Sequence, residues 1–443
     1  MMKKQHVAGL DGIDETHDAT RRSWVASANG HPEFPLQNLP MGVFRAGSRA
    51  RLAVAIGDEL LDLQAAHELG ALGELRGETA EAIQTETLNA WMALPAALRR
   101  ELRQAVWRLL CENVPEGVIG ARLAGSLTLP RSSVKMALPA AVGDYTDFYA
   151  GIHHASNCGE IFRPELPLQP NYRHLPVAYH GRASTLRPSG TPVRRPSSQI
   201  CQDGQPVLSA TEKLDYEMEL AIWIGPGNDL AHPIGIESAA EHVAGFGLLN
   251  DWSARDIQAW ESLPLGPFQG KNFMTSLSPW VVTSDAMAPF RVPRMAREAG
   301  HPGTLPYLDG DSDARAGGVD IAVEVFIQTA RMREAGEAPH RLSRGSATAL
   351  YWTPAQMVAH HTVGGCDLRP GDLFGTGTIS MASHQDCGCL LEMTEGGKKP
   401  VALPNGETRG FLQDGDEVIL RGFCAREGFA SIGLGECRGV VQG

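Results

Sequence analysis

A cluster of residues that could do chemistry lies between residues 143 and 157. It contains Asp147, a second aspartate, two tyrosines and the adjacent histidines His153 and His154. The flanking residues show no helical period, and so many polar groups in a short span are typical of a loop that presents them to a ligand. We therefore expect a functional loop here.

Carboxylates in semi-apolar surroundings recur at Glu217, Glu219 and Asp251. Glu217 and Glu219 stand two apart where a strand-like run begins, so strand alternation places both side chains on one face. Two neighbouring carboxylates repel, so the pair is either solvated at an edge or held by a cation. Asp251 lies between an apolar run and Trp252, and a buried unpaired carboxylate is costly. Together with Asp147, these acids would form an all-oxygen site for Ca²⁺ or Mg²⁺, and not for zinc.

Histidine and a few basic side chains could act beside such a cation. A histidine titrating near ~6.5 is the usual general base at neutral pH, and His154 is a candidate. The alternative is a histidine with only a structural hydrogen bond, as we expect for His360 and His361. Lys271 is a lone lysine in an apolar, glycine-rich loop, a setting that a solvated lysine does not need. Side chains that could orient an anionic substrate are Arg163, Arg255 and Gln258.

The length and pattern of the chain predict two ordered domains. At 443 residues it exceeds one ordinary core. Residues 1–22 are polar and aperiodic, so we expect a disordered extension. Residues 23–136 suggest a small β-rich domain with a hairpin turn at Gly57–Asp58 and a helix over Pro95–Leu110.

Residues 137–443 form the larger predicted domain. They are rich in Gly and Pro, and short strand-like runs occur at 220–224, 320–327 and 417–420. Helices are expected over Ile236–Val243 and Pro354–His361. Many short strands divided by turns predict a closed or sandwiched β architecture within a mainly β, α+β protein.

Charge and cysteine usage exclude several functions. The net charge of −12 argues against a nucleic-acid or anionic-membrane partner. The close pair Cys387 and Cys389 has the wrong spacing for a zinc knuckle, so the eight cysteines are expected to be reduced and mostly buried. Neither a signal peptide nor an apolar run of membrane-spanning length is found, so we expect a cytoplasmic protein.

Long collinear motifs give the chain a family resemblance that extends from about residue 23 to the C-terminus. They closely resemble motifs of the fumarylacetoacetases. The segments are Asn38–Phe44, Gly143–Tyr149, Leu175–Ser184, Ser189–Pro196, Asn250–Gln258, Pro264–Phe268, Leu368–Leu373 and Gly377–Ser380.

The resemblance implies a fold and an activity. The fold would be an N-terminal SH3-like β-barrel domain followed by a fumarylacetoacetase-type mixed β-roll, in a homodimer. The activity would be metal-dependent hydrolysis of a carbon–carbon bond of 4-fumarylacetoacetate, a small diketo-dicarboxylate, to fumarate and acetoacetate. That reaction is the last step of tyrosine and phenylalanine breakdown.

The resemblance also assigns roles to residues. His154 matches the general base, and Glu392 matches its orienting partner. The residues that match calcium ligands are Asp147, Glu217, Glu219 and Asp251. With Asp251, the residues that match a second cation site, for Mg²⁺, are Lys271 and Thr275. The groups that match polarising residues are Lys271, Arg255 and Gln258. The positions that match substrate contacts are Tyr149, Arg163, Tyr179, Gln258 and Thr378.

Two departures from the family pattern leave the substrate open. Ser262 stands where the family usually has a tyrosine, so one phenol contact to a substrate carboxylate is missing. Ile152 and His153 replace more polar residues beside His154. The first alternative is therefore a relative that hydrolyses another acylpyruvate or β-diketo acid. A non-catalytic scaffold is a second alternative, but a scaffold does not need clustered acids.

Overall fold

The computed structural model describes residues 12–73, 75 and 77–443, and its largest sheet has thirteen strands. The ten strands on its main path are β1 (Met41–Ala46), β2 (Arg49–Ile56), β3 (Glu59–Asp62), β4 (Thr128–Pro130), β6 (Tyr145–Phe148), β7 (Ala178–Gly181), β13 (Met218–Ile224), β14 (Val243–Asp251), β17 (Trp280–Thr283) and β22 (Leu373–Gly375). Neighbours follow the order β4-β3-β2-β1-β17-β14-β13-β22-β6-β7. Three more strands join beside this path, namely β5 (Lys135–Met136), β8 (Leu186–Pro188) and β16 (Thr275–Leu277).

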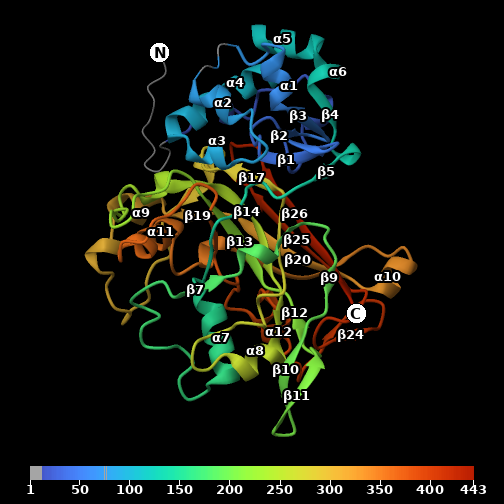
Figure 1. Ribbon diagram of the computed structural model, residues 1–443, viewed down its shortest axis with the longest axis vertical. Coiled ribbons are helices and arrows are strands. Elements are labelled where there is room, and N and C mark those ends of the chain that lie inside the picture. Colours follow the sequence, from blue (N-terminus) through green and yellow to red (C-terminus); the bar gives the residue numbers. More distant parts are fainter. Residues whose placement is uncertain (1–11, 74, 76) are drawn as a thin grey trace.

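The sheet continues from the N-terminal part of the chain into the larger C-terminal part. Met41 on β1 lies opposite Val281 on β17, where the blue upper part of the molecule meets the lower part (Figure 1). The predicted turn at Gly57–Asp58 is confirmed, because it joins the antiparallel strands β2 and β3. The helices of the N-terminal part are α1 (Leu63–Glu68), α2 (Glu78–Ala82), α3 (Asn89–Ala93), α4 (Ala96–Leu110), α5 (Pro115–Arg122) and α6 (Ala124–Leu127).

The helix α4 confirms the prediction for Pro95–Leu110. Its apolar stripe, which includes Leu102, Val106 and Leu109, is buried in the core of the N-terminal part. Burial of such a stripe, more than helix propensity, stabilises a helix of this length.

A second sheet of five strands lies in the C-terminal part, in the order β21-β20-β25-β26-β9. Its strands are β9 (Val193–Arg194), β20 (Ala322–Gln328), β21 (His340–Ser346), β25 (Glu417–Cys424) and β26 (Ile432–Gln442). The strand predictions at 220–224, 320–327 and 417–420 are confirmed by β13, β20 and β25. Among the described residues, eight further strands form four two-stranded sheets. They are β10 (Ser197–Gln202) with β11 (Gln205–Ala210), β12 (Leu214–Asp215) with β15 (Ser253–Ala254), β18 (Arg291–Val292) with β19 (Gly318–Val319), and β23 (Val401–Ala402) with β24 (Thr408–Arg409).

Helices of the C-terminal part lie around these sheets (Figure 1). They are α7 (Ile152–Phe162), α8 (Arg255–Glu261), α9 (Asp311–Ala316), α10 (Ala330–Glu334), α11 (Pro354–Thr362) and α12 (Leu390–Met393). The helix predicted over Pro354–His361 is confirmed by α11. Its first turn is closed by a reciprocal capping box between Thr353 and Gln356.

Three local predictions are wrong. Residues 12–22 are ordered, because Thr16 and His17 are buried and His17 Nε2 lies 2.8 Å from the carbonyl oxygen of Asp285. The prediction of disorder for residues 1–11 lies outside the described residues. The helix expected over Ile236–Val243 shrinks to a 3₁₀ turn at Ala239–His242, because Val243 already pairs with Ile224 on β13.

The third correction concerns residues 143–157, which are not a loop. They supply β6 and the start of α7. Strand β6 pairs with β22 on one side and with β7 on the other, so partners distant in sequence impose the extended conformation on a polar stretch.

A mixed α+β fold that is mostly sheet is confirmed. The SH3-like barrel and the domain division at residue 137 stay predictions. Among the described residues, each helix is too short or too polar to cross a membrane.

Candidate active site

Three carboxylates from neighbouring strands meet inside the larger sheet. Asp147 lies on β6, Glu219 on β13 and Asp251 at the end of β14. One carboxylate oxygen of each lies within 4.8 Å of those of the others. All three side chains are buried, so the possibility that Glu219 lies on a solvated strand face is excluded. We call these three residues the acid cluster.

The acid cluster leaves room and free oxygens for a cation. Gly375 on β22 lies between the strands, and a Cβ there would lie only 2.6 Å from Asp147 Oδ1 and 2.8 Å from Glu219 Oε2. Tyr145 donates to the other oxygen of Asp147 at 3.0 Å, and the Gly377 N–H donates to Glu219 Oε2 at 2.9 Å. Within the described part of the chain, Asp147 Oδ1 and Glu219 Oε1 have no hydrogen-bond partner.

Electrostatics also favour a cation in the acid cluster. Burial, followed by repulsion from Asp251, raises the pKa of Asp147 well above its usual value. Burial and the charge of Asp147 likewise raise the pKa of Glu219. Buried carboxylates that resist ionisation and lack donors fit a divalent cation, because its charge replaces the missing donors.

Asp251 is the member of the acid cluster with a full set of hydrogen bonds. It accepts from Lys271 Nζ at 2.8 Å, from the Tyr179 hydroxyl at 2.9 Å and from Thr275 Oγ1 at 3.0 Å. Burial lowers the pKa of Lys271, but Asp251 and Glu217 outweigh it and raise the pKa above its usual value. Lys271 is therefore an ammonium ion.

Glu217 lies beside the acid cluster and not within it. Its carboxylate accepts from Arg255 Nη1 at 2.7 Å and forms a short ion pair with Lys271 Nζ. His154 Nε2 lies 4.0 Å from the same carboxylate. Burial raises the pKa of Glu217, but Lys271 and then Arg255 lower it below its usual value. Glu217 thus connects the acid cluster with the imidazole.

His154 and Glu392 form a buried pair although 238 positions separate them in the sequence. His154 Nδ1 on α7 lies 2.6 Å from Glu392 Oε2 on α12. The same carboxylate accepts from Ser380 Oγ at 2.8 Å, from Asn157 Nδ2 at 2.9 Å and from Cys389 Sγ at 3.0 Å. These donors fix Glu392, and Glu392 in turn orients the imidazole ring.

The pair is electrostatically coupled. Burial raises the pKa of Glu392, but His154 outweighs it and lowers the value to about 2. Burial lowers the pKa of His154, but Cys158 and then Glu392 outweigh it and raise the value well above 6.5. The carboxylate is therefore ionised at neutral pH and favours the protonated ring.

Of three other predicted residues, Tyr149 contacts the pair. Tyr149 packs edge-on against His154, with ring centroids 5.3 Å apart. Gln258 Oε1 accepts from Arg255 Nη1 at 3.1 Å. Thr378 is buried, and its hydroxyl has no hydrogen-bond partner among the described residues.

Arg163 is not brought into this buried group. It follows the last residue of α7 and is exposed, and its side chain forms no ion pair or hydrogen bond within the described residues. Ser262 caps the end of α8 by donating to the backbone oxygen of Gln258. Its hydroxyl is therefore engaged with the backbone.

Asp215 is a functional neighbour that the sequence interpretation missed. It accepts from Arg255 Nε at 2.9 Å and from the N–H groups of Leu390 and Leu391, also at 2.9 Å. Because these N–H groups open α12, Asp215 holds both Arg255 and the helix that carries Glu392. The only sequence signal was its place two residues before Glu217.

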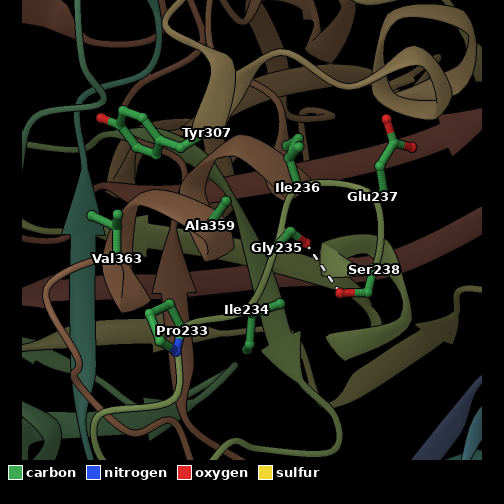
Figure 2. A pocket seen from close by; sticks show the side chains of 9 residues that line it. All are labelled: Pro233, Ile234, Gly235, Ile236, Glu237, Ser238, Tyr307, Ala359 and Val363. Carbon is green, nitrogen blue, oxygen red and sulfur yellow. Dashed lines mark hydrogen bonds between the residues drawn. The ribbon is translucent and has the colours of Figure 1, made fainter.

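A hollow of about 410 Å³ elsewhere on the molecule contains none of these residues. Its lining, between the segment before the Ala239–His242 turn and α11, is shown in Figure 2. The lining is mostly apolar, and the Ser238 hydroxyl is bonded to the Gly235 carbonyl at 3.1 Å. The nine lining residues contain no cluster of catalytic or metal-binding side chains.

An acid cluster suited to a cation, next to an imidazole–carboxylate pair and two buried cationic side chains, is the arrangement expected of a metal-assisted hydrolase. Comparisons with known proteins agree with this class. Residues 37–139 match the family model described as fumarylacetoacetase N-terminal, and residues 145–442 match fumarylacetoacetate (FAA) hydrolase C-terminal.

Similar proteins span nearly the whole chain. A fumarylacetoacetase of Oryza sativa subsp. japonica is 45% identical over 428 residues, covering 95% of this chain and 97% of the relative. One of Homo sapiens is 44% identical over 414 residues, covering 92% and 96%. A solved fumarylacetoacetate hydrolase from Exiguobacterium antarcticum is 18% identical, with a TM-score of 0.49, and covers 91% of this chain and 99% of that one. The chain belongs to the fumarylacetoacetase family.

Proposed function

We propose that the protein hydrolyses the carbon–carbon bond of 4-fumarylacetoacetate to fumarate and acetoacetate, the last step of tyrosine and phenylalanine breakdown. The observation that carries this proposal is the continuous buried path from the acid cluster through Lys271 and Glu217 to His154. Such a path would allow a cation, a general base and two cationic donors to surround one reacting carbonyl. The relatives named above support the substrate.

We infer that Ca²⁺ is held by the acid cluster with Glu217 as a fourth ligand. The free oxygens of Asp147 and Glu219 support this assignment. The cation would hold the diketone oxygens and make the attacked carbonyl more electrophilic. For Mg²⁺ near Asp251, Thr275 Oγ1 is a suitable donor, whereas protonated Lys271 could contribute only its backbone carbonyl.

His154 would act as the general base. In the neutral form of the ring, with Nδ1–H donated to Glu392, Nε2 is free to take a proton from the attacking water. After attack, Arg255, Lys271 and Gln258 would face the developing oxyanion. Donors of this kind contribute roughly 3–4 kcal/mol each at a dry site.

The remaining predicted residues would hold the substrate. Tyr149 lies against His154, Tyr179 donates its hydroxyl to Asp251, and Thr378 has a buried hydroxyl without a partner among the described residues. Exposed Arg163 would bind a carboxylate at the outer end of the substrate. A homodimer and a cytoplasmic location are the expectations that accompany the family.

The test is a parallel measurement of kcat/KM for fumarylacetoacetate and for simpler acylpyruvates. We expect fumarylacetoacetate to be cleaved at least as well, in a reaction that a chelator abolishes and Ca²⁺ or Mg²⁺ restores. The reverse order of substrates would favour the related acylpyruvate or β-diketo-acid hydrolase. Ser262 supports that second candidate, because its hydroxyl is bonded to the backbone of Gln258 and offers nothing to a substrate carboxylate.

A further inference from the structure

Thiols surround the His154–Glu392 pair, and the proposed hydrolysis uses none of them. Cys389 Sγ lies 3.0 Å from Glu392 Oε2. Cys158 Sγ lies 3.7 Å from Nδ1 and 3.6 Å from Nε2 of His154. Cys387 Sγ accepts from Asn157 Nδ2 at 3.7 Å, and Asn157 also donates to Glu392. Side chains of this type are the ligands of soft or borderline metals.

We propose that His154, Cys389 and Glu392 form a binding site for a thiophilic divalent cation such as Zn²⁺, and that its binding stops turnover. One ligand atom from each of the three residues lies within 4.8 Å of the other two. All three residues are buried, at 3%, 0% and 1% exposure, so few waters compete for the ion. The inhibition, though not the binding, rests on the role proposed above for His154.

The donors need only a small rearrangement to bind the ion. Zinc lies about 2.0–2.1 Å from imidazole nitrogen and about 2.3 Å from thiolate sulfur, so donors at a tetrahedral ion are roughly 3.3–3.6 Å apart. The present separations of 2.6 Å and 3.0 Å from Glu392 Oε2 are shorter than this. The side chains must therefore move apart by roughly 0.6–0.8 Å. Cys158, with Sγ 3.7 Å from Nδ1, would supply a further thiol ligand.

The donor set separates this site from the acid cluster. One nitrogen, one sulfur and one oxygen suit Zn²⁺ or Cd²⁺, whereas the three carboxylates of the acid cluster suit Ca²⁺ or Mg²⁺. The sequence spacing of Cys387 and Cys389 rules out a zinc knuckle, but only one of these cysteines is required here. The chain would thus hold a hard and a soft cation at neighbouring sites.

Proton accounting explains why the soft ion would inhibit. From the neutral ring, the ion releases the proton of the Cys389 thiol to solvent, and the imidazole proton moves from Nδ1 to Nε2; from the protonated ring, the Nδ1 proton is released as well. A neutral imidazole with its Nδ1 on a metal carries its remaining proton on Nε2. Nε2 can then no longer accept a proton from water.

Metal binding explains these thiols better than oxidation does. Burial, followed by the charge of Glu392, raises the pKa of Cys389 well above its usual value. The free thiol is therefore protonated and unreactive toward oxidants, whereas a bound zinc ion takes up a thiol as thiolate.

The binding test uses the full chain saturated with Ca²⁺. The exposed cysteines Cys201 and Cys366 are first replaced by serine to remove other accessible thiols. Equilibrium dialysis should then show one Zn²⁺ per chain, and Cd²⁺ should produce an ultraviolet thiolate-to-metal band. Cys389→Ser should remove the band and weaken Zn²⁺ binding by more than the 10–100-fold that loss of an outer hydrogen-bond partner costs.

Two variants make the binding result specific. Cys424→Ser alters another buried thiol, which contacts Met287, and should leave both signals unchanged. Glu392→Gln should weaken Zn²⁺ binding as Cys389→Ser does, and the melting temperature of each variant reports on folding. Unchanged Zn²⁺ binding in both Cys389→Ser and Glu392→Gln would overturn the proposal. Release of Zn²⁺ by excess Ca²⁺ would overturn it too, because the ion would then occupy the acid cluster.

The inhibition test measures fumarylacetoacetate hydrolysis against Zn²⁺ at saturating Ca²⁺. The inhibition constant should follow the dialysis Kd and rise by the same factor in Cys389→Ser, each variant being compared with its own uninhibited rate. Inhibition equally strong in Cys389→Ser would overturn the proposal. If the chain does not hydrolyse the substrate but Zn²⁺ binding depends on Cys389, the metal site stands and the proposed function fails.

Discussion

Replacing Glu219 with glutamine should stabilise the protein when no divalent cation is bound and should remove the stabilisation that Ca²⁺ provides. Glu219 is fully buried, and its Oε1 has no hydrogen-bond partner among the described residues. The new amide keeps the shape, removes the charge and can donate to the free oxygen of Asp147. Without a divalent cation the variant should therefore be the more stable protein, and with Ca²⁺ the wild type should be the more stable one.

The magnitude follows from burial and mass action. An unpaired buried polar group costs roughly 1–3 kcal/mol, and a charged one more, so the metal-free variant should gain about that amount. This corresponds to a rise of a few degrees in Tm, given about 2–4 °C per kcal/mol for chains of 150–250 residues and less for longer ones. Ca²⁺ at 100 times its Kd stabilises the wild type by about 2.7 kcal/mol, and the variant should lose most of this gain.

The sign of the pH dependence provides a second check. The folded-state pKa of Glu219 is raised, so the folded chain binds the proton more tightly than the unfolded chain does. Its destabilising effect is absent below the unfolded pKa and grows as pH rises toward the folded pKa. The Tm gain of Glu219→Gln should therefore shrink in acid.

The assay is thermal unfolding by circular dichroism, with chelator and then with added Ca²⁺. Glu160→Gln, an exposed substitution on α7, is the matched control and should change neither Tm. A variant that is less stable than wild type without cation, or that keeps the full Ca²⁺ response, would refute the reasoning.

Three further predictions concern activity. His154→Ala should lower kcat by about 10²–10⁴-fold and Glu392→Gln by less, with calcium content unchanged in both; calcium loss by atomic absorption would contradict the base assignment. In wild type, kcat/KM should fall as pH drops through a limb above pH 6.5, because Cys158 and Glu392 outweigh burial and raise the pKa of His154, and the protonated ring cannot accept a proton. Glu392→Gln should move that limb down by roughly one to two pH units, since a charged hydrogen bond contributes about 1.5–3 kcal/mol. A limb that does not move would show that it does not report the titration of His154. Arg163→Ala should raise KM several-fold with little change in kcat, and an unchanged KM would remove Arg163 from the substrate site.

The acids of the site could be predicted from the sequence, because an acidic residue among apolar neighbours is a local signal that its charge is buried. Glu219 and Asp251 stand in apolar runs, and an acid in such a run needs a partner. The sequence did not show that β22 would place Gly375 between Asp147 and Glu219, since that arrangement depends on strand pairing between distant segments.

The residues around His154 could not be predicted in the same way. Glu392 was assigned from family resemblance, because no local pattern links α12 to α7 across 238 positions. Asp215 was missed for a related reason. Its partner Arg255 is placed by the pairing of β12 with β15, and local composition does not reveal that pairing. The error over residues 143–157 also arose from long-range strand pairing, which overrode a loop-like composition.

Charge balance within the site bears on the number of cations it would hold during turnover. The site contains six buried carboxylates, namely Asp147, Asp215, Glu217, Glu219, Asp251 and Glu392. Among the described residues, Arg255 and Lys271 oppose them when His154 is neutral, as a general base must be, so with all six ionised the site carries four excess negative charges. One divalent cation leaves an excess of two, which would repel a dicarboxylate substrate. A second divalent cation brings the site to neutrality, so the substrate charge itself favours two cations over one.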